Sequence, residues 1–148
     1  MAGIFGVCHF DDRPVEPALV ARMSETLAHH GRDGEGVAIE HSTALGCRLL
    51  HTTHQFAARE QPVRRASGTR LVFDGRLDNR DDLISALRDR CAVSAETSDA
   101  ELAAASYEIT GVEFARHLLG DFSIALFDAR ERRVVLARDG MGIRPLYY

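Results

Sequence analysis

The chain opens with MAGIFGV, residues 1–7, a short apolar stretch that carries two glycines. Residues 4–10, IFGVCHF, are apolar at successive positions, which predicts a buried strand in the centre of a sheet. Chain ends normally fray in water, so a strand so close to the terminus needs an explanation. A terminal residue carries a free α-amine, which titrates near pH ~8 and can act as the base for its own nucleophilic side chain. This chemistry needs Cys, Ser or Thr after the initiator, and Ala2 has only a methyl group. An ordinary first core strand is the alternative interpretation.

Length and composition indicate one globular domain over residues 1–148, with 45% hydrophobic and 27% charged residues. The formal net charge of −4 argues against nucleic acid as a partner. No apolar run reaches the ~18 residues of a membrane span, and residues 1–20 lack the features of a signal peptide. Three widely spaced cysteines indicate free thiols in a cytoplasmic protein, with neither a disulfide framework nor a metal site.

The remaining pattern predicts a two-layered β core with helices outside it, an α+β fold. Both faces of the strand at 121–128 are apolar, so its sheet is expected to be covered on both sides. Helices are predicted at 16–29, 80–90 and 98–110, the last from a capping-box spacing that begins at Ser98. Strands are predicted at 37–40, 44–50, 70–73, 121–128, 133–138 and 143–148. An apolar strand at the last residues suggests a domain truncated at its C-terminus. Its open edge would favour a homo-oligomer or docking onto another part of the protein.

Seven segments in order resemble the glutaminase domain of asparagine synthetases. GIFGV (3–7) and HGRDGEG (30–36) resemble the start of that domain, and LGCRL (45–49) matches an LGHRRL-like strand. FDGRLDN (73–79) is similar to FNGEIYN, and SDAE (98–101) to SDTE. GDFSIALFD (120–128) resembles GMFAFALWD, and ARDGMGIRPLYY (137–148) resembles ARDRFGIKPLYY. The resemblance covers the whole chain with family-like spacing.

The resemblance implies a class II glutamine amidotransferase domain with the N-terminal-nucleophile hydrolase fold, an αββα sandwich of two mainly antiparallel sheets. In that family a Cys after Met attacks glutamine and releases ammonia to a C-terminal synthetase domain. That partner domain, of the ATP-pyrophosphatase type, uses ATP and Mg, and nothing in this chain resembles its nucleotide loop. The resemblance therefore implies no cofactor for these 148 residues themselves.

The family's site residues are only partly kept. Ala2 occupies the position of the nucleophile, and Asp74 replaces an Asn that helps to bind the oxyanion beside Gly75. The resemblance assigns Arg48 to the glutamine α-carboxylate and Asp99 to its α-amine, with Gly75 also lining the substrate site. A surface ion pair for Arg48 and a helix N-terminal acid for Asp99 are alternative interpretations.

Other departures lie close to this site. Arg76 replaces a Glu, and His30 and Arg32 replace the Arg and Pro of the family's HRGPD loop. These changes favour a degenerate domain without glutaminase activity, a scaffold for an amide-forming ligase, as in the β-lactam synthetase and lasso-peptide cyclase branch. An asparagine synthetase glutaminase domain with an engineered Cys-to-Ala change, which binds glutamine without hydrolysing it, is the second hypothesis. A free-standing binding module is the third.

Overall fold

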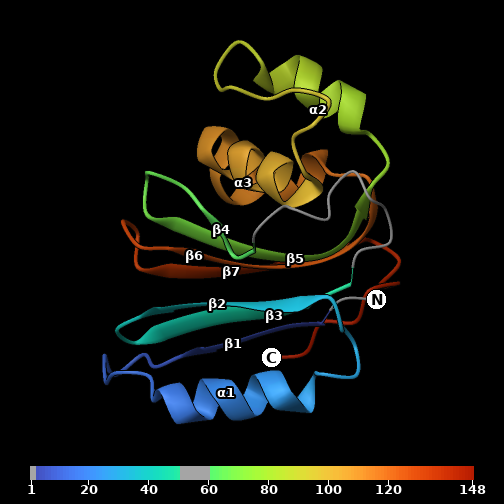
Figure 1. Cartoon of the computed structure of the whole chain (residues 1–148). Helices are drawn as coiled ribbons and strands as arrows, with labels where there is room; N and C mark the ends of the chain where they lie inside the picture. The colour runs from blue at the N-terminus through green and yellow to red at the C-terminus, as the bar shows by residue number, and fades with distance from the viewer. Residues whose placement is uncertain (1–2, 51–60) are drawn as a thin grey trace.

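The computed structural model describes residues 3–50 and 61–148 (Figure 1). The elements are β1 (Gly3–Cys8), α1 (Pro17–Thr26), β2 (Gly34–Glu40), β3 (Thr43–Leu49), β4 (Val63–Arg64), β5 (Thr69–Leu77), α2 (Arg80–Leu87), α3 (Asp99–Thr110), the 3₁₀ helix η2 (Gly111–His117), β6 (Gly120–Asp128) and β7 (Arg133–Arg138). Within these residues every helix is too short or too polar to traverse a bilayer.

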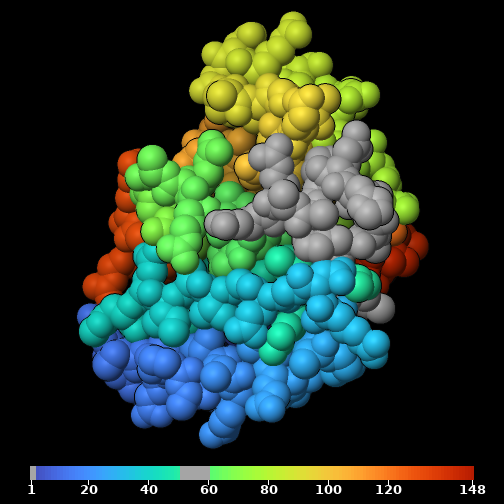
Figure 2. Space-filling view, viewed as in Figure 1, coloured from blue at the N-terminus to red at the C-terminus, as the bar shows by residue number. Residues whose placement is uncertain are grey.

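Two antiparallel sheets form the centre of the molecule. The first has the strand order β1-β3-β2 and the second has the order β4-β5-β6-β7. Helix α1 covers the outer face of the first sheet, α3 covers the outer face of the second, and α2 packs on α3 farther from the sheet (Figure 1). Figure 2 shows the same division along the chain, with the first sheet and α1 below and the helices α2 and α3 above. The predicted αββα sandwich is therefore confirmed.

The alternation of side chains along β5 explains why both faces of this strand are apolar. Leu71 and Phe73 belong to the core beneath α3, whereas Val72 points between the sheets, where it packs with Leu45 and Cys47 of β3. A strand buried on both faces cannot show the polar alternation of a surface strand. This is why the sequence pattern predicts strands without assigning a face to each side chain.

Local sequence signals are confirmed at both ends of α3. The Ser98 side chain accepts a hydrogen bond from the Glu101 backbone N–H, and the Glu101 carboxylate accepts one from the backbone N–H of Ser98. The helix ends at Gly111, whose φ of 62° lies in the left-handed region that favours glycine. Both signals depend on residues that are close in sequence, so they can be found without tertiary information.

Three predictions about strands are wrong. β1 is an edge strand of its sheet rather than a central one, and of its residues only Phe5 is buried. β5 does not end at Phe73 but continues to Leu77, because residues 74–77 pair with β6. Residues 143–148 form no strand, and the edges of the second sheet are β4 and β7 instead. The edge that was expected to drive self-association is therefore not formed by these residues.

A buried Tyr–Asp pair links α3 to the end of β6. The Tyr107 hydroxyl donates a 2.9 Å hydrogen bond to Asp128 Oδ2, while Asp128 Oδ1 accepts from two backbone N–H groups of the following turn. Burial, aided by the neighbouring carboxylate, raises the pKa of Tyr107 to about 12. Burial alone would raise the pKa of Asp128, but hydrogen bonds from the Glu131 N–H and from Tyr107 hold it below its usual value.

Tyr107→Phe is expected to lower the free energy of unfolding at pH 7 by about 1–3 kcal/mol, because it removes a bond to a buried carboxylate. In the unchanged protein the folded Tyr107 keeps its proton above pH ~10, where the unfolded tyrosine loses it. Stability should therefore fall between pH ~10 and pH 12, and this fall should be smaller in the variant. Asp128 contributes stability that is present above pH ~4 and lost as the pH falls further.

Urea unfolding of the unchanged protein and of Tyr107→Phe, at pH 7 and through the acidic and alkaline ranges given above, measures the loss of stability and its pH dependence. Tyr147→Phe is the control, because that side chain is exposed and should change neither the stability nor its pH dependence. Equal stability of Tyr107→Phe and the unchanged protein would show that the Tyr107–Asp128 bond contributes nothing.

Candidate active site

The family resemblance assigns described site residues to three elements: Arg48 to β3, Asp74 and Gly75 to β5, and Asp99 to α3. The start of β1, the final residues of β3 and β5, and the C-terminal segment lie toward one end of the sandwich (Figure 1). Gly3, the first described residue, is paired with Arg48 in the β1–β3 register. It therefore lies next to the residue that the resemblance assigns to the glutamine α-carboxylate. Ala2 itself lies outside the described residues.

Asp74 lies on β5 with its carboxylate almost buried, and the residue is 8% exposed. Its Oδ2 lies 3.8 Å from Nη1 of Arg144, a residue seventy positions later in the chain. Arg76 does not supply this positive charge, because its side chain is largely exposed and pairs with Asp78 and Asp121. Arg144 rather than Arg76 is therefore the arginine whose side chain lies beside the Asp74 carboxylate.

A turn built on Asp139 places Arg144 at this position. The Asp139 carboxylate accepts hydrogen bonds from the backbone N–H groups of Arg144, Ile143 and Met141, at 3.0, 2.9 and 3.1 Å. These bonds, that of Arg144 first, hold the pKa of Asp139 below its ordinary value against the opposing effect of burial. The backbone N–H of Asp139 donates to the carbonyl of Phe122 on β6, so the turn is fixed to the second sheet.

Gly75 follows Asp74 in a conformation that other residues rarely adopt, with φ of 137°. A Cβ atom there would lie 2.0 Å from the carbonyl oxygen of Asp121 and 2.7 Å from Cα of Phe122. The close approach of β5 to β6 thus requires glycine for packing alone. The presence of Gly75 is consistent with an oxyanion site but is not specific evidence for one.

Arg48 takes part in a network between β3, β2 and α1. Its Nε donates a 3.0 Å hydrogen bond to the Ser24 carbonyl, and its Nη2 lies 2.9 Å from Glu35 Oε2. The Ser24 hydroxyl donates to the same Glu35 oxygen at 2.8 Å. Arg48 therefore forms an ion pair, as the alternative interpretation proposed, and a substrate carboxylate would have to compete with Glu35 for the guanidinium.

Asp99 joins the start of α3 to the end of β5 and the start of α2. Its Oδ2 accepts a 2.9 Å hydrogen bond from the Leu77 backbone N–H, and its Oδ1 pairs with the Arg80 guanidinium. Arg80 also donates to the carbonyls of Ala95 and Thr97. A negative charge in the first turn of a helix is favourable in itself, so the local role of Asp99 is structural.

The structure thus brings Asp74, Gly75 and Asp99 together around the second half of β5. The contacts described for Arg48 lie in the other sheet and α1. Sequence reasoning missed the partners of these residues. They are Arg144 for Asp74, with Asp139 holding Arg144 in place; Glu35 and Ser24 for Arg48; and Arg80 for Asp99. Asp139 and Arg144 belong to the 137–148 segment, one of those that carry the family resemblance. That resemblance was the sequence signal that could have pointed to them. The other pairings connect residues eleven or more positions apart, and no local pattern marks them.

Thiol and metal chemistry find little support in the described part of the chain. Cys47 is fully buried between the sheets, and burial raises its pKa to about 12, so the unreactive thiol form persists at neutral pH. The Thr43 hydroxyl donates to Cys8 Sγ at 3.4 Å. Residues 3–50 and 61–148 contain no group of three or more His, Cys, Asp and Glu side chains suited to a metal ion.

The sequence of this chain is similar to those of known proteins. The family model described as the glutamine amidotransferase domain matches residues 1–148. Glutamine-hydrolysing asparagine synthetase 3 of Bacillus subtilis is 30% identical over 100% of this chain and 25% of that protein. The asparagine synthetase of Sandersonia aurantiaca is 33% identical over 99% of the chain and 28% of its own length. Asparagine synthetase B of Escherichia coli is 31% identical, with 99% and 26% covered.

Solved structures agree on the fold. Glutamine phosphoribosylpyrophosphate amidotransferase of Bacillus subtilis superposes with a TM-score of 0.72 at 17% identity, over 94% of this chain and 37% of that one. An allosteric regulatory enzyme of purine biosynthesis gives 0.74 at 17% identity, over 98% and 38%. The chain spans about a quarter of the length of the curated relatives named above. It belongs to the glutamine amidotransferase domain family, in the form found in asparagine synthetase-type proteins.

Proposed function

We propose that this domain has lost glutamine hydrolysis and serves as a scaffold for an ATP-dependent, amide-forming synthetase domain. The observation that carries the proposal is Ala2, because a methyl group at the nucleophile position cannot form a thioester with glutamine. The nearly buried carboxylate of Asp74 supports it, because an ionised carboxylate accepts hydrogen bonds and cannot donate one to an oxyanion. Loss of one oxyanion donor commonly lowers the rate by ~10²–10³.

The partner we propose is an ATP-pyrophosphatase-type synthetase domain, with ATP and Mg as its cofactors. The support is that the relatives are asparagine synthetases of about four times this length. The altered 73–83 segment, FDGRLDNRDDL, favours the β-lactam synthetase and lasso-peptide cyclase branch, whose members use an amine in place of ammonia. The three free cysteines support a cytoplasmic location.

A second candidate function is binding of glutamine without hydrolysis. It is favoured by Arg48, Gly75 and Asp99, which keep the family's residue types. Arg48 and Asp99 are already engaged by Glu35 and Arg80, so bound glutamine would have to displace existing ion pairs. This competition makes weak binding the expected result.

Ammonia release from glutamine tests the main proposal. The unchanged protein is expected to release no more ammonia from glutamine than buffer does. E. coli asparagine synthetase B serves as the positive control. Turnover that survives repurification and is blocked by a thiol alkylator would contradict the proposal. It would direct attention to Cys8 and Cys91, because the high pKa of Cys47 makes it a poor nucleophile.

A further inference from the structure

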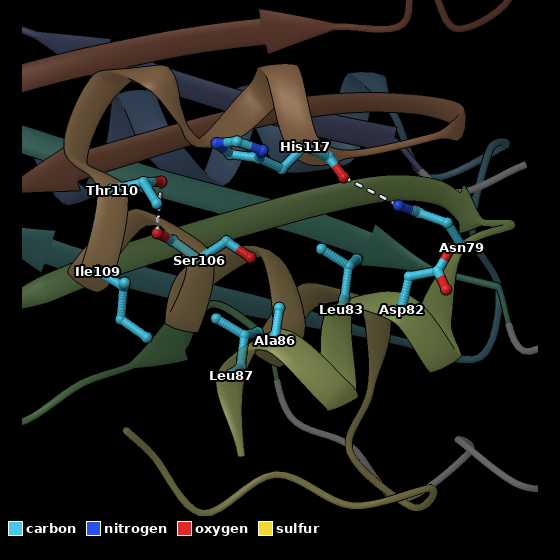
Figure 3. A pocket seen from close by; sticks show the side chains of 9 residues that line it. All are labelled: Asn79, Asp82, Leu83, Ala86, Leu87, Ser106, Ile109, Thr110 and His117. Atoms are coloured by element: carbon cyan, nitrogen blue, oxygen red, sulfur yellow. Dashed lines mark hydrogen bonds between the residues drawn. The ribbon is translucent and has the colours of Figure 1, made fainter. Parts of the chain in front are cut away.

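A pocket of about 280 Å³ lies in the helical layer, on the far side of the second sheet from the first (Figure 3). It is formed between α2, α3 and η2, and its size is close to the lower end of the range for small-molecule sites. Leu83 and Leu87 of α2 and Ile109 of α3 make its wall mainly apolar. None of the residues that the resemblance assigns to glutamine lines this pocket, so it is separate from the candidate active site.

The pocket contains a polar atom without a partner. Ser106 on α3 is only 2% exposed, and its Oγ makes no hydrogen bond with any described residue. Figure 3 shows this hydroxyl directed into the space between Leu83 and His117. Thr110, one turn later, instead donates its hydroxyl to the Ser106 carbonyl at 2.9 Å. A buried hydroxyl without a partner is unfavourable, so this atom is well placed to bond to a ligand.

The charge of the residues that line the pocket favours one class of ligand. Among the nine described residues that line it, Asp82 is the one whose side chain carries a formal charge at neutral pH when His117 is unprotonated. The amide of Asn79 is already engaged, since it donates to the His117 carbonyl and accepts from the Leu119 N–H. A carboxylate at the rim favours a cation and disfavours an anion.

We propose that the pocket binds a small organic amine. Its apolar body would contact Leu83, Leu87 and Ile109, its ammonium group would lie toward Asp82, and Ser106 would supply a hydrogen-bonding group at the buried end. This site is independent of the proposed loss of glutaminase activity, and a failure of either proposal leaves the other unaffected.

Three probes with the same ring separate charge from shape: benzylamine, benzyl alcohol and benzoate. Titration at pH 8, followed by NMR of the leucine and isoleucine methyl groups, is expected to show benzylamine binding with a Kd of about 1 mM, as is usual for so small a ligand. Benzyl alcohol should bind several-fold more weakly, and benzoate should not bind at accessible concentrations. Shifts should be confined to Leu83, Leu87 and Ile109.

Variants assign the contribution of each group. Asp82→Asn should weaken benzylamine binding about fivefold and remove its advantage over the alcohol. Asp81→Asn is the matched control, because Asp81 shares the first turn of α2 but does not line the pocket. Ser106→Ala should weaken both ligands by roughly threefold to tenfold. It should leave the melting temperature unchanged or higher, because the deleted hydroxyl has no partner.

Ala86→Phe provides an independent check, because the exposed Ala86 side chain lines the pocket and a phenyl ring there would fill it. This variant should abolish binding of both ligands while circular dichroism shows an unchanged fold. Three results would overturn the proposal: no benzylamine binding at 10-fold above the expected Kd, equal binding of benzoate, or unchanged binding by Ala86→Phe.

Discussion

Ala2→Cys alone is expected to leave ammonia release at the level of the unchanged protein, whereas Ala2→Cys combined with Asp74→Asn should raise it by about 10²-fold or more. After removal of Met1, the new Cys would have its own α-amine as a base, so attack on glutamine becomes possible. The oxyanion that forms would then face the Asp74 carboxylate, which is nearly buried and therefore weakly screened by solvent. Asn at this position would offer an N–H donor instead.

The position of Arg144 also affects the charge that the oxyanion would meet. Its Nη1 lies 3.8 Å from Asp74 Oδ2, so the carboxylate is partly neutralised in the folded protein. Neutralisation lowers the repulsion of an oxyanion, but it does not convert the carboxylate into a hydrogen-bond donor. In the double variant the Asp74 carboxylate is gone, and the positive charge of Arg144 would stabilise the oxyanion instead. Removing Arg144 as well should therefore reduce the activity of the double variant.

The experiment compares ammonia release by the unchanged protein, both single variants and the double variant. The two changes act on one intermediate, so their effects should be strongly non-additive. Ala2→Cys with Asp78→Asn is the control, because Asp78 is an exposed carboxylate paired with Arg76 nearby in the sequence. Robust turnover by Ala2→Cys alone would show that Asp74 is harmless to the oxyanion. It would favour the hypothesis of a glutaminase inactivated only at its nucleophile.

Gly75→Ala is expected to lower the free energy of unfolding by about 3–5 kcal/mol, a large part of the roughly 5–15 kcal/mol that is typical of a folded domain. The added methyl group would have to occupy space 2.0 Å from a backbone oxygen of β6. β6 lies between β5 and β7, so it cannot move aside without disturbing both pairings. The left-handed φ of 137° adds a conformational cost of order 1–3 kcal/mol for alanine.

Chemical denaturation of Gly75→Ala and Gly140→Ala measures this effect. At Gly140 an added Cβ meets nothing within 4 Å, so its substitution should change stability by less than ~0.5 kcal/mol. Similar stabilities for the two variants would contradict the packing role of Gly75. The result also bears on function, because a glycine that packing requires will persist in a domain that has lost its chemistry.

Some properties of this protein follow from the sequence because they depend on neighbouring residues. The capping box of Ser98 and Glu101 and the helix end at Gly111 operate within one or two turns of a helix. The hairpin of β6 and β7 needs only two apolar strands and a short turn. The family resemblance likewise rests on segments read in order along the chain.

Tertiary structure decided where the strands lie and which charges meet. Whether β1 is central or at an edge depends on the other strands of its sheet, which no property of residues 3–8 encodes. Asp74 meets Arg144, Arg48 meets Glu35, and Asp99 meets Arg80 because the sheets and helices bring distant residues within a few ångströms. Charged side chains satisfy one another through space rather than along the chain, so sequence reasoning identified candidate site residues but not the partners that already hold them.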